Sequence, residues 1–430
     1  MLALLSPTIK TSENKMLLSL QSVVGLLVII FGCALFSATR ADIRPTIVVK
    51  ALAVQVVFAL ILLKLPGSRY FFELLNQAID TLIRATQEGS SFIFGFLGGG
   101  ELPYQETGAG SSLVLAFRTL PLVIVVSALS AILVYWRVLP LIMKAMSKLL
   151  EKTLNIGGAV GLAISANAFL GMVESPLLIK PYLARLSRSE LFSVMMAGMA
   201  TIAGSMLAIE AAVIGDVVPN AVGHLLSASL ITLPAVVYVS HLLIPNTGSI
   251  TGSDQDVDSD ADSLMDAIVK GTQSGLQVFL NIIAMVIVIV ALVYLVNATL
   301  GLLPDIFGEA ITLERILGVL LAPLTWLLGI PWSEAVTTGQ LMGVKTVLTE
   351  FIAYVRLGEL PVDALSERSK IIITYALCGF ANFVSLGIMI AGLVTMVPER
   401  RQEILSLGTK SIVGGTLATC STACLVGIIL

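Results

Sequence analysis

Charged side chains are scarce in this chain. Only 12% of its 430 residues are Asp, Glu, Lys or Arg, whereas 57% are hydrophobic and the mean hydropathy is +0.97. Soluble globular domains contain about 25% charged residues, so this composition excludes an ordinary soluble enzyme. We expect an all-α polytopic membrane protein whose surroundings are the lipid bilayer, and no nucleic-acid partner.

Histidine and cysteine are also rare. The only histidines are His224 and His241, too few to favour a histidine metal site. The four cysteines lie within apolar segments and lack the paired spacing of metal ligands: Cys33, Cys378, Cys420 and Cys424. We interpret them as small buried hydrophobic residues rather than disulfides or a redox site.

Eight apolar runs approach or exceed the ~20 residues that a membrane-spanning helix needs. They lie at about 16–36, 46–63, 120–136, 190–214, 220–244, 267–300, 370–396 and 405–430. The first run also has features of a cleaved signal, but more spans follow at once, so we interpret it as a span. The segment 68–116 is too polar to cross and predicts an interfacial helix followed by a loop.

Two further apolar regions are each divided into halves, which favours re-entrant hairpins over spans. The first region consists of Gly157–Leu170 and Pro176–Leu186, each too short to cross. The second consists of Leu313–Leu328 and Pro331–Tyr354, joined by Gly329-Ile-Pro331. We therefore predict eight transmembrane helices and two re-entrant hairpins.

The basic residues fall into four clusters, which predict the orientation of the chain. Lys and Arg gather in 40–50, 137–152, 180–188 and 399–410, and such clusters favour the cytoplasmic side. Placing all four there puts both termini outside and the acidic, solvated 246–266 segment inside.

The order of hairpin, span and span occurs twice. The first span of each unit contains Gly-x-Ala followed by a polar residue, at 198–201 and 379–382, and a serine a few positions on. Because a single helix separates the units, the second is inverted relative to the first. Inverted repeats with broken helices are typical of alternating-access transporters. Alternatively, the small residues serve only close helix packing.

This order divides the chain into five parts. They are an N-terminal scaffold (1–152), repeat 1 of a transport domain (153–245), an acidic linker (246–266), a scaffold helix (267–303) and repeat 2 (304–430).

Two glutamates stand out within the apolar segments. Glu174 lies beside a helix break that Gly171 and Pro176 predict, and Glu350 lies near the start of a second such stretch, Gly343–Ser385. A charge at membrane depth costs roughly 2.5 to 3.5 kcal/mol and usually faces a pathway or a partner. Their oxygens can accept hydrogen bonds from a polar solute, as Asn382 and Ser385, one helical turn apart, can also do. Asn167 and Thr201 offer oxygens to a small cation. The pattern predicts the binding centre of a secondary transporter.

Longer motifs resemble the concentrative nucleoside transporter family. They are Gly-x-x-Glu-x-Pro at 171–176, Ser-Glu-Leu-Phe at 189–192, Met-Ala-Thr-Ile-Ala-Gly-Ser at 199–205, Leu-Ala-Pro-Leu-Thr-Trp-Leu-Leu-Gly-Ile-Pro-Trp at 321–332, Gly-x-Lys-Thr-Val-Leu-x-Glu-Phe-x-Ala-Tyr at 343–354 and Ala-Leu-Cys-Gly-Phe-Ala-Asn at 376–382. The resemblance implies a homotrimer in the plasma membrane, the inner membrane of a bacterium, that imports nucleosides with sodium or protons and needs no other cofactor.

The resemblance also implies which residues bind. The expected substrate-binding residues are Met172, Val173, Glu174, Met206, Glu350, Asn382 and Ser385. Of these, Glu350, Asn382 and Ser385 match ribose ligands and Glu174 matches a base ligand. The expected sodium ligands are Asn167, Thr201 and the carbonyls of Leu170 and Ile202.

The chain departs from the family in the base half of the site. Met172 and Val173 replace a usual Gln and Thr, and Thr349 replaces an Asn, so we predict an altered base preference. Glu210 adds a carboxylate where relatives tend to be uncharged. It is either a substitute base contact, a proton-coupling group or a glutamate snorkelling toward the membrane interface.

Other functions and couplings remain open at this point. An intramembrane enzyme could use Glu174 and Glu350 as paired carboxylates, but no nucleophile with a base partner is visible. A channel is the third alternative. The presence of Asn167 and Thr201 favours sodium coupling, whereas Val173 and Glu210 leave room for protons.

Overall fold

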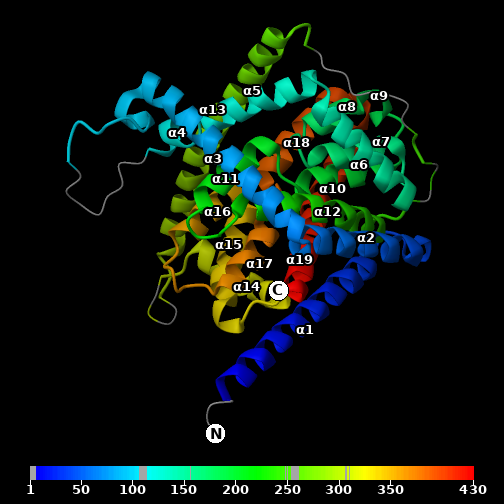
Figure 1. Ribbon diagram of the computed structural model, residues 1–430. Coiled ribbons are helices and arrows are strands. Elements are labelled where there is room, and N and C mark those ends of the chain that lie inside the picture. The colour runs from blue at the N-terminus through cyan, green and yellow to red at the C-terminus, as the bar shows by residue number, and fades with distance from the viewer. Residues whose placement is uncertain are drawn as a thin grey trace.

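The structure, a computed structural model, describes residues 6–105, 114–154, 156–246, 248, 250–252, 261–305, 308 and 310–430, and these residues fold into helices and loops (Figure 1). Among them, seven stretches are long and apolar enough to cross a membrane, or eight if one bent helix pair is a single span. The predicted all-helical polytopic class is therefore confirmed. Parts of the predicted 68–116 loop and of the acidic linker lie outside the described residues.

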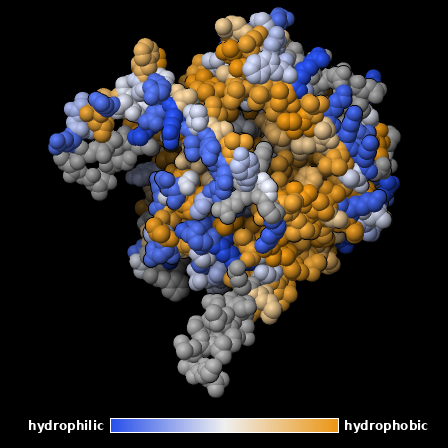
Figure 2. All heavy atoms as spheres, viewed as in Figure 1, coloured by the Kyte–Doolittle hydropathy of each residue, from blue (hydrophilic) through white to orange (hydrophobic). Residues whose placement is uncertain are grey.

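The N-terminal part contributes three long apolar helices and two amphipathic ones. The apolar helices are α1 (Ser6–Leu35), α2 (Pro45–Lys64) and α5 (Leu122–Tyr135), which follows the short α4 (Leu115–Arg118). The amphipathic helices are α3 (Pro66–Phe94) and α6 (Val138–Leu154). Figure 2 shows a broad hydrophobic surface crossed by a diagonal strip of hydrophilic side chains along α3. This strip fits the expected polar helix between spans.

The first repeat contains two broken helices and one continuous helix. The segments are α7 (Gly158–Asn167), α8 (Glu174–Leu178), α9 (Lys180–Leu183), α10 (Arg188–Ala200), α11 (Gly204–Ile214) and α12 (Ala221–Leu243). A capping box starts α10, because Ser187 Oγ accepts from the Glu190 N–H at 3.2 Å and the Glu190 carboxylate accepts from the Ser187 N–H at 2.9 Å.

After the long helix α13 (Leu264–Leu300) and the helix α14 (Leu313–Leu327), the second repeat has the same order as the first. Its segments are α15 (Trp332–Val347), α16 (Glu350–Glu359), α17 (Glu367–Leu377), α18 (Phe383–Met396) and α19 (Arg401–Ile429). The helices α14 and α15 are bent by 117° at the predicted Gly329-Ile-Pro331 joint.

The predicted continuous half Pro331–Tyr354 is wrong, because a second break separates α15 from α16 at Leu348 and Thr349. Thr349 Oγ1 accepts from the Ile352 N–H at 3.3 Å and so caps a new helix. Hydrogen bonding by a short polar side chain to nearby backbone competes with helix continuation. The pair α15 and α16 thus corresponds to the pair α7 and α8 of the first repeat.

Both predicted spans 190–214 and 370–396 are broken as well. The first stops at Ala200 and resumes at Gly204; the second stops at Leu377 and resumes at Phe383. Gly379 adopts φ +144° in the second break, and a Cβ there would lie 2.8 Å from the Ala200 carbonyl group. Only glycine has both the conformational freedom and the small size that this position requires. The two breaks therefore meet near the centre of the molecule.

The packing separates a buried group of helices from an outer pair. The helices α10, α12 and α19 contact one another and are buried along most of their lengths. Outside them, α13 lies along α5 (Figure 1). A Cβ added at Gly271 or Gly275 would lie within 2.7 Å of α5 atoms, so this G-x-x-x-G stretch lets the two helices approach closely.

The predicted burial of the cysteines is confirmed. All four are free and buried, with exposed fractions of 1% or less.

Candidate binding site at the helix breaks

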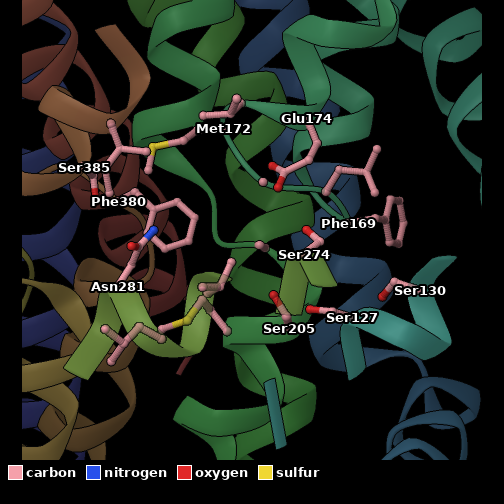
Figure 3. Close-up of a pocket in the computed structure, with 18 of the residues that line it drawn as sticks. Ser127, Ser130, Phe169, Met172, Glu174, Ser205, Ser274, Asn281, Phe380 and Ser385 are labelled. Atoms are coloured by element: carbon pink, nitrogen blue, oxygen red, sulfur yellow. The ribbon is translucent and has the colours of Figure 1, made fainter. Parts of the chain in front are cut away.

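A cavity of about 500 Å³ lies where the broken helices face α5 and α13 (Figure 3). Its lining includes most of the expected substrate residues: Met172, Val173, Glu174, Met206, Glu350 and Ser385. These residues come from four different breaks or helix starts that are far apart in the sequence. The structure thus brings both glutamates to one cavity, as the sequence predicted.

Glu350 is held by the residues that end the neighbouring break. It is the first residue of α16, is only 3% exposed and accepts a hydrogen bond from Asn382 Nδ2 at 2.7 Å. Asn382 Oδ1 in turn accepts from the Ser385 N–H at 2.7 Å and caps α18. A carboxylate at a helix N-terminus is also stabilised by the helix dipole. Asn382 does not line the cavity itself, so it fixes Glu350 and the start of α18 from behind.

Glu174 has a different environment. It is the first residue of α8, two residues before the predicted start at Pro176, and its exposed side chain points into the cavity (Figure 3). Its carboxylate folds back over Gly171 so closely that any Cβ at Gly171 would collide with it. No described residue forms a hydrogen bond or an ion pair with this carboxylate, which leaves it available to a ligand.

The opposite wall contains polar residues that the sequence analysis missed. Ser127 and Ser130 come from α5, and Ser274 and Asn281 come from α13 (Figure 3). Their spacings of three and seven place each pair on one helix face. That spacing could have indicated a polar face toward a cavity, but small polar residues inside apolar spans are equally typical of helix–helix packing. The aromatic lining residues Phe169, Phe351 and Phe380 were also missed.

The expected cation ligands lie together between the ends of α7 and α10. Thr201 Oγ1 donates to the Asn167 carbonyl oxygen at 3.1 Å, and the Gly204 N–H donates to the Phe169 carbonyl oxygen at 3.0 Å. Asn167 Nδ2 donates to Ala163 at 3.2 Å. In the described part of the chain, no donor reaches Asn167 Oδ1 or the carbonyl oxygens of Leu170 and Ile202. Such free oxygens suit a hard cation such as Na⁺.

A buried charged group lies behind the cavity. Lys345 on α15 is fully buried, and its Nζ donates to the Ala376 carbonyl oxygen at 2.8 Å. Glu210 on α11 is also fully buried, does not line the cavity, and neither carboxylate oxygen has a hydrogen-bond partner. Because its side chain does not reach the surface, Glu210 is not a snorkelling residue.

Three family models match successive parts of the chain. They are described as Na⁺ dependent nucleoside transporter N-terminus (residues 24–97), Nucleoside recognition (116–217) and Na⁺ dependent nucleoside transporter C-terminus (224–427). The chain belongs to the Na⁺-dependent nucleoside transporter family. Named relatives agree with this assignment over nearly the full length of both sequences.

Among these relatives is uncharacterized transporter YutK of Bacillus subtilis, 38% identical over 413 residues, which cover 95% of this chain and 98% of the relative. Nucleoside permease NupC of Helicobacter pylori is 34% identical over 415 residues, 95% of this chain and 97% of the relative. The protein is therefore a multi-pass membrane transporter related to bacterial permeases, and the alternative of an intramembrane enzyme is excluded.

Solved structures of the family member CNTnw superpose on nearly the whole chain. An inward-facing, substrate-bound state has a TM-score of 0.87 at 34% identity and covers 95% of this chain and 98% of its own. An outward-facing state has a TM-score of 0.88 at 33% identity and covers 96% and 99%. A fold that adopts both inward-facing and outward-facing states is typical of an alternating-access transporter. A permanently open channel would not alternate between such states.

Proposed function

We propose that this member of the family imports nucleosides across a bacterial inner membrane together with Na⁺. The observation that carries the proposal is the hydrogen-bonded series Glu350, Asn382 and Ser385 on one side of a cavity whose other glutamate, Glu174, has no protein partner. A fixed acceptor and a free acceptor in the lining of one cavity suit a ligand with hydroxyls at one end and base amines at the other.

The sugar half of the proposed site is formed by the second repeat. Glu350 accepts hydrogen bonds from ribose hydroxyls, and Asn382 keeps its carboxylate in one orientation. Ser385 adds a hydroxyl at the cavity wall. A buried carboxylate has lost its water shell, and ribose hydroxyls can take the place of that water. They bind more favourably when the orientation of the Glu350 carboxylate is already fixed before the ligand arrives.

The base half is formed by the first repeat and is more apolar. Met172, Val173 and Met206 line it beside Glu174. These side chains offer surface for packing against a base but few directional hydrogen bonds. We propose that Glu174 alone supplies the charged contact to the base, and that the chain's order of preference among bases therefore differs from that of relatives with Gln and Thr.

The proposed ion site lies at the breaks of the first repeat. Asn167, Thr201 and the carbonyls of Leu170 and Ile202 would hold Na⁺ beside the loop that carries Met172 to Glu174. An ion bound there draws the end of α7 toward the break between α10 and α11, and so stabilises the base half of the cavity.

The proposed architecture is eight spans and two re-entrant hairpins in two inverted repeats. The supporting observation is the shared order of broken pair, broken helix and continuous helix in α7 to α12 and in α15 to α19. We propose that these units, 153–245 and 304–430, move as a transport domain against a scaffold of 1–152 and 267–303. The acidic linker 246–266 lies inside, both termini lie outside, and three chains assemble as a homotrimer.

Uptake by proteoliposomes tests the function. Vesicles containing the purified protein should accumulate labelled uridine or adenosine only when an inward Na⁺ gradient is applied, and preloaded unlabelled nucleoside should accelerate entry by exchange. Glu350→Gln should abolish accumulation of every ribonucleoside alike. Equal entry with K⁺ in place of Na⁺, or retention of full uptake by E350Q, would contradict the proposal.

A further inference from the structure

A buried cluster of one lysine and two glutamates lies behind the cavity. We define it as Glu210 on α11, Lys345 on α15 and Glu350 on α16. All three are at most 3% exposed. The helix α11 packs against α16, which begins at Glu350, and Lys345 lies five residues before Glu350 near the end of α15. Only Glu350 also lines the cavity. Glu350 therefore faces the cavity, whereas the Glu210 carboxylate lies behind it and is not part of the cavity lining.

The members of the cluster differ in the hydrogen bonds that they form with residues around it. Glu350 accepts from Asn382, and Lys345 donates to Ala376 and, at 3.5 Å, to Thr419 Oγ1. Glu210 is the member with two unpartnered carboxylate oxygens. A buried ionised carboxylate without hydrogen bonds is strongly disfavoured, whereas the protonated form is neutral.

The charges of the cluster do not balance when all three groups are ionised. Two carboxylates against one ammonium leave one net negative charge inside the protein. One proton on Glu210 brings the cluster to neutrality. A neutral cluster is easier to carry across the low-dielectric membrane interior than a charged one.

In the described part of the chain, Lys345 is the only cation that interacts electrostatically with Glu210. The titratable groups that interact with it electrostatically come from α15, α16 and the end of α17: Lys345, Glu350, Tyr354 and Cys378. The helix α12, which also packs on α11, carries His224, Tyr238 and His241, and each has a partner of its own. His224 Nδ1 pairs with the Tyr375 hydroxyl at 3.0 Å, the Tyr238 hydroxyl donates to Gln55 Oε1 at 3.3 Å, and His241 Nε2 accepts from the Arg44 N–H at 3.0 Å. The helix α5 carries no charged residue.

We propose that Glu210 is a proton-binding site, and that its proton is carried with nucleoside and Na⁺ through the transport cycle. The inference rests on the proposed nucleoside import. A proton from the external solution enters by the cavity, passes Glu350 and forms a bond with one Glu210 oxygen. The cluster then changes from one net negative charge to none, and the proton leaves when the cavity opens to the cytoplasm.

The first test is the pH profile of uridine uptake at a fixed, limiting Na⁺ gradient. Wild-type uptake should fall as pH rises, by up to about tenfold per pH unit where deprotonated Glu210 dominates. Glu210→Gln, which resembles the protonated form, should give a flat profile with the Na⁺ dependence retained. The control is Glu88→Gln, which removes an exposed carboxylate on α3 and should keep the wild-type profile.

The second test does not depend on the folding of a variant. Proteoliposomes containing wild-type protein and a trapped pH dye should acidify when uridine enters, and detergent-solubilised protein in weak buffer should take up protons when uridine binds. Absence of both signals overturns the proposal even if E210Q fails to fold, as does an unchanged pH profile in folded E210Q. Lack of any Na⁺-driven uridine uptake by the wild type would instead overturn the proposed function itself.

Discussion

The orientation of the Glu350 carboxylate depends on Asn382, which uses both ends of its amide. Nδ2 donates to Glu350 and Oδ1 caps α18, each at 2.7 Å. Asn382→Ala removes both bonds, so we expect nucleoside affinity to fall by about 5- to 150-fold, since an unpaired buried polar group costs about 1 to 3 kcal/mol. Calorimetric titration with uridine measures this loss.

A matched control is Asn76→Ala, which removes an exposed amide–amide hydrogen bond to Asn220, and neither residue lines the cavity. Its affinity should stay at the wild-type value. If N382A binds uridine as tightly as N76A does, the positioning role of Asn382 is wrong.

Two neighbouring side chains should govern the choice of base. The double variant Met172→Gln, Val173→Thr introduces the amide and hydroxyl that the resemblance predicts for the family at these positions. Since Glu350, Asn382 and Ser385 are unchanged, we expect the ranking of adenosine, cytidine and uridine to change while the preference for ribose over deoxyribose stays. Competition against labelled uridine uptake measures both. The control is Met265→Gln, which places a polar side chain at an exposed position on α13. An unchanged ranking of bases in the double variant would contradict the assignment of Met172 and Val173 to the base half of the site.

At the scale of the helices, the break at Gly379 depends on a residue without a side chain. Gly379→Ala would force a Cβ to within 2.8 Å of the Ala200 carbonyl group at φ +144°, so we expect a loss of at least about 1 kcal/mol and a lower melting temperature in detergent. Gly387→Ala in α18 is the control, because a Cβ there meets nothing within 4 Å and should stabilise by about 0.4 to 1 kcal/mol. Equal melting temperatures for the two variants would show that the chain is not tightly packed where Gly379 meets Ala200.

The sequence predicted the continuous helices well and the broken ones only in part. Apolar runs of sufficient length identified α2, α12, α13 and α19 within a few residues, because a bilayer leaves few other structures for such runs. The break before Glu350 was missed because Thr349 is compatible with either a helix interior or a cap, and only tertiary packing decides between them.

Site residues were predicted where a charge or a family motif marked them. Glu174 and Glu350 stood out against apolar neighbours, and both line the cavity. Ser127, Ser274 and Asn281 did not stand out, because a single small polar group costs little inside a helix bundle. The burial of Glu210 beside α16, the helix that begins at Glu350, depends on the packing of α11 against α16, which no local pattern encodes.

For the whole molecule, the two repeats imply opposite entry sides for their broken pairs, and this can be tested by labelling. The four native cysteines are buried and free, so single introduced cysteines can report accessibility without removing them. If the four basic clusters lie inside, the 246–266 linker also lies inside and α13 crosses to the outside. In intact cells freed of the outer membrane, a membrane-impermeant maleimide should therefore label Asp305→Cys and leave Gly252→Cys unlabelled.

Both of these positions are exposed on the protein surface, so a difference between them reports the side of the membrane and not burial. Permeabilising the cells should make Gly252→Cys reactive while Asp305→Cys stays as before. The reverse pattern would place the termini inside, and labelling of both in intact cells would mean that α13 does not cross. In either case the inverted arrangement, and with it the movement of 153–245 and 304–430 as one transport domain, would need a different explanation.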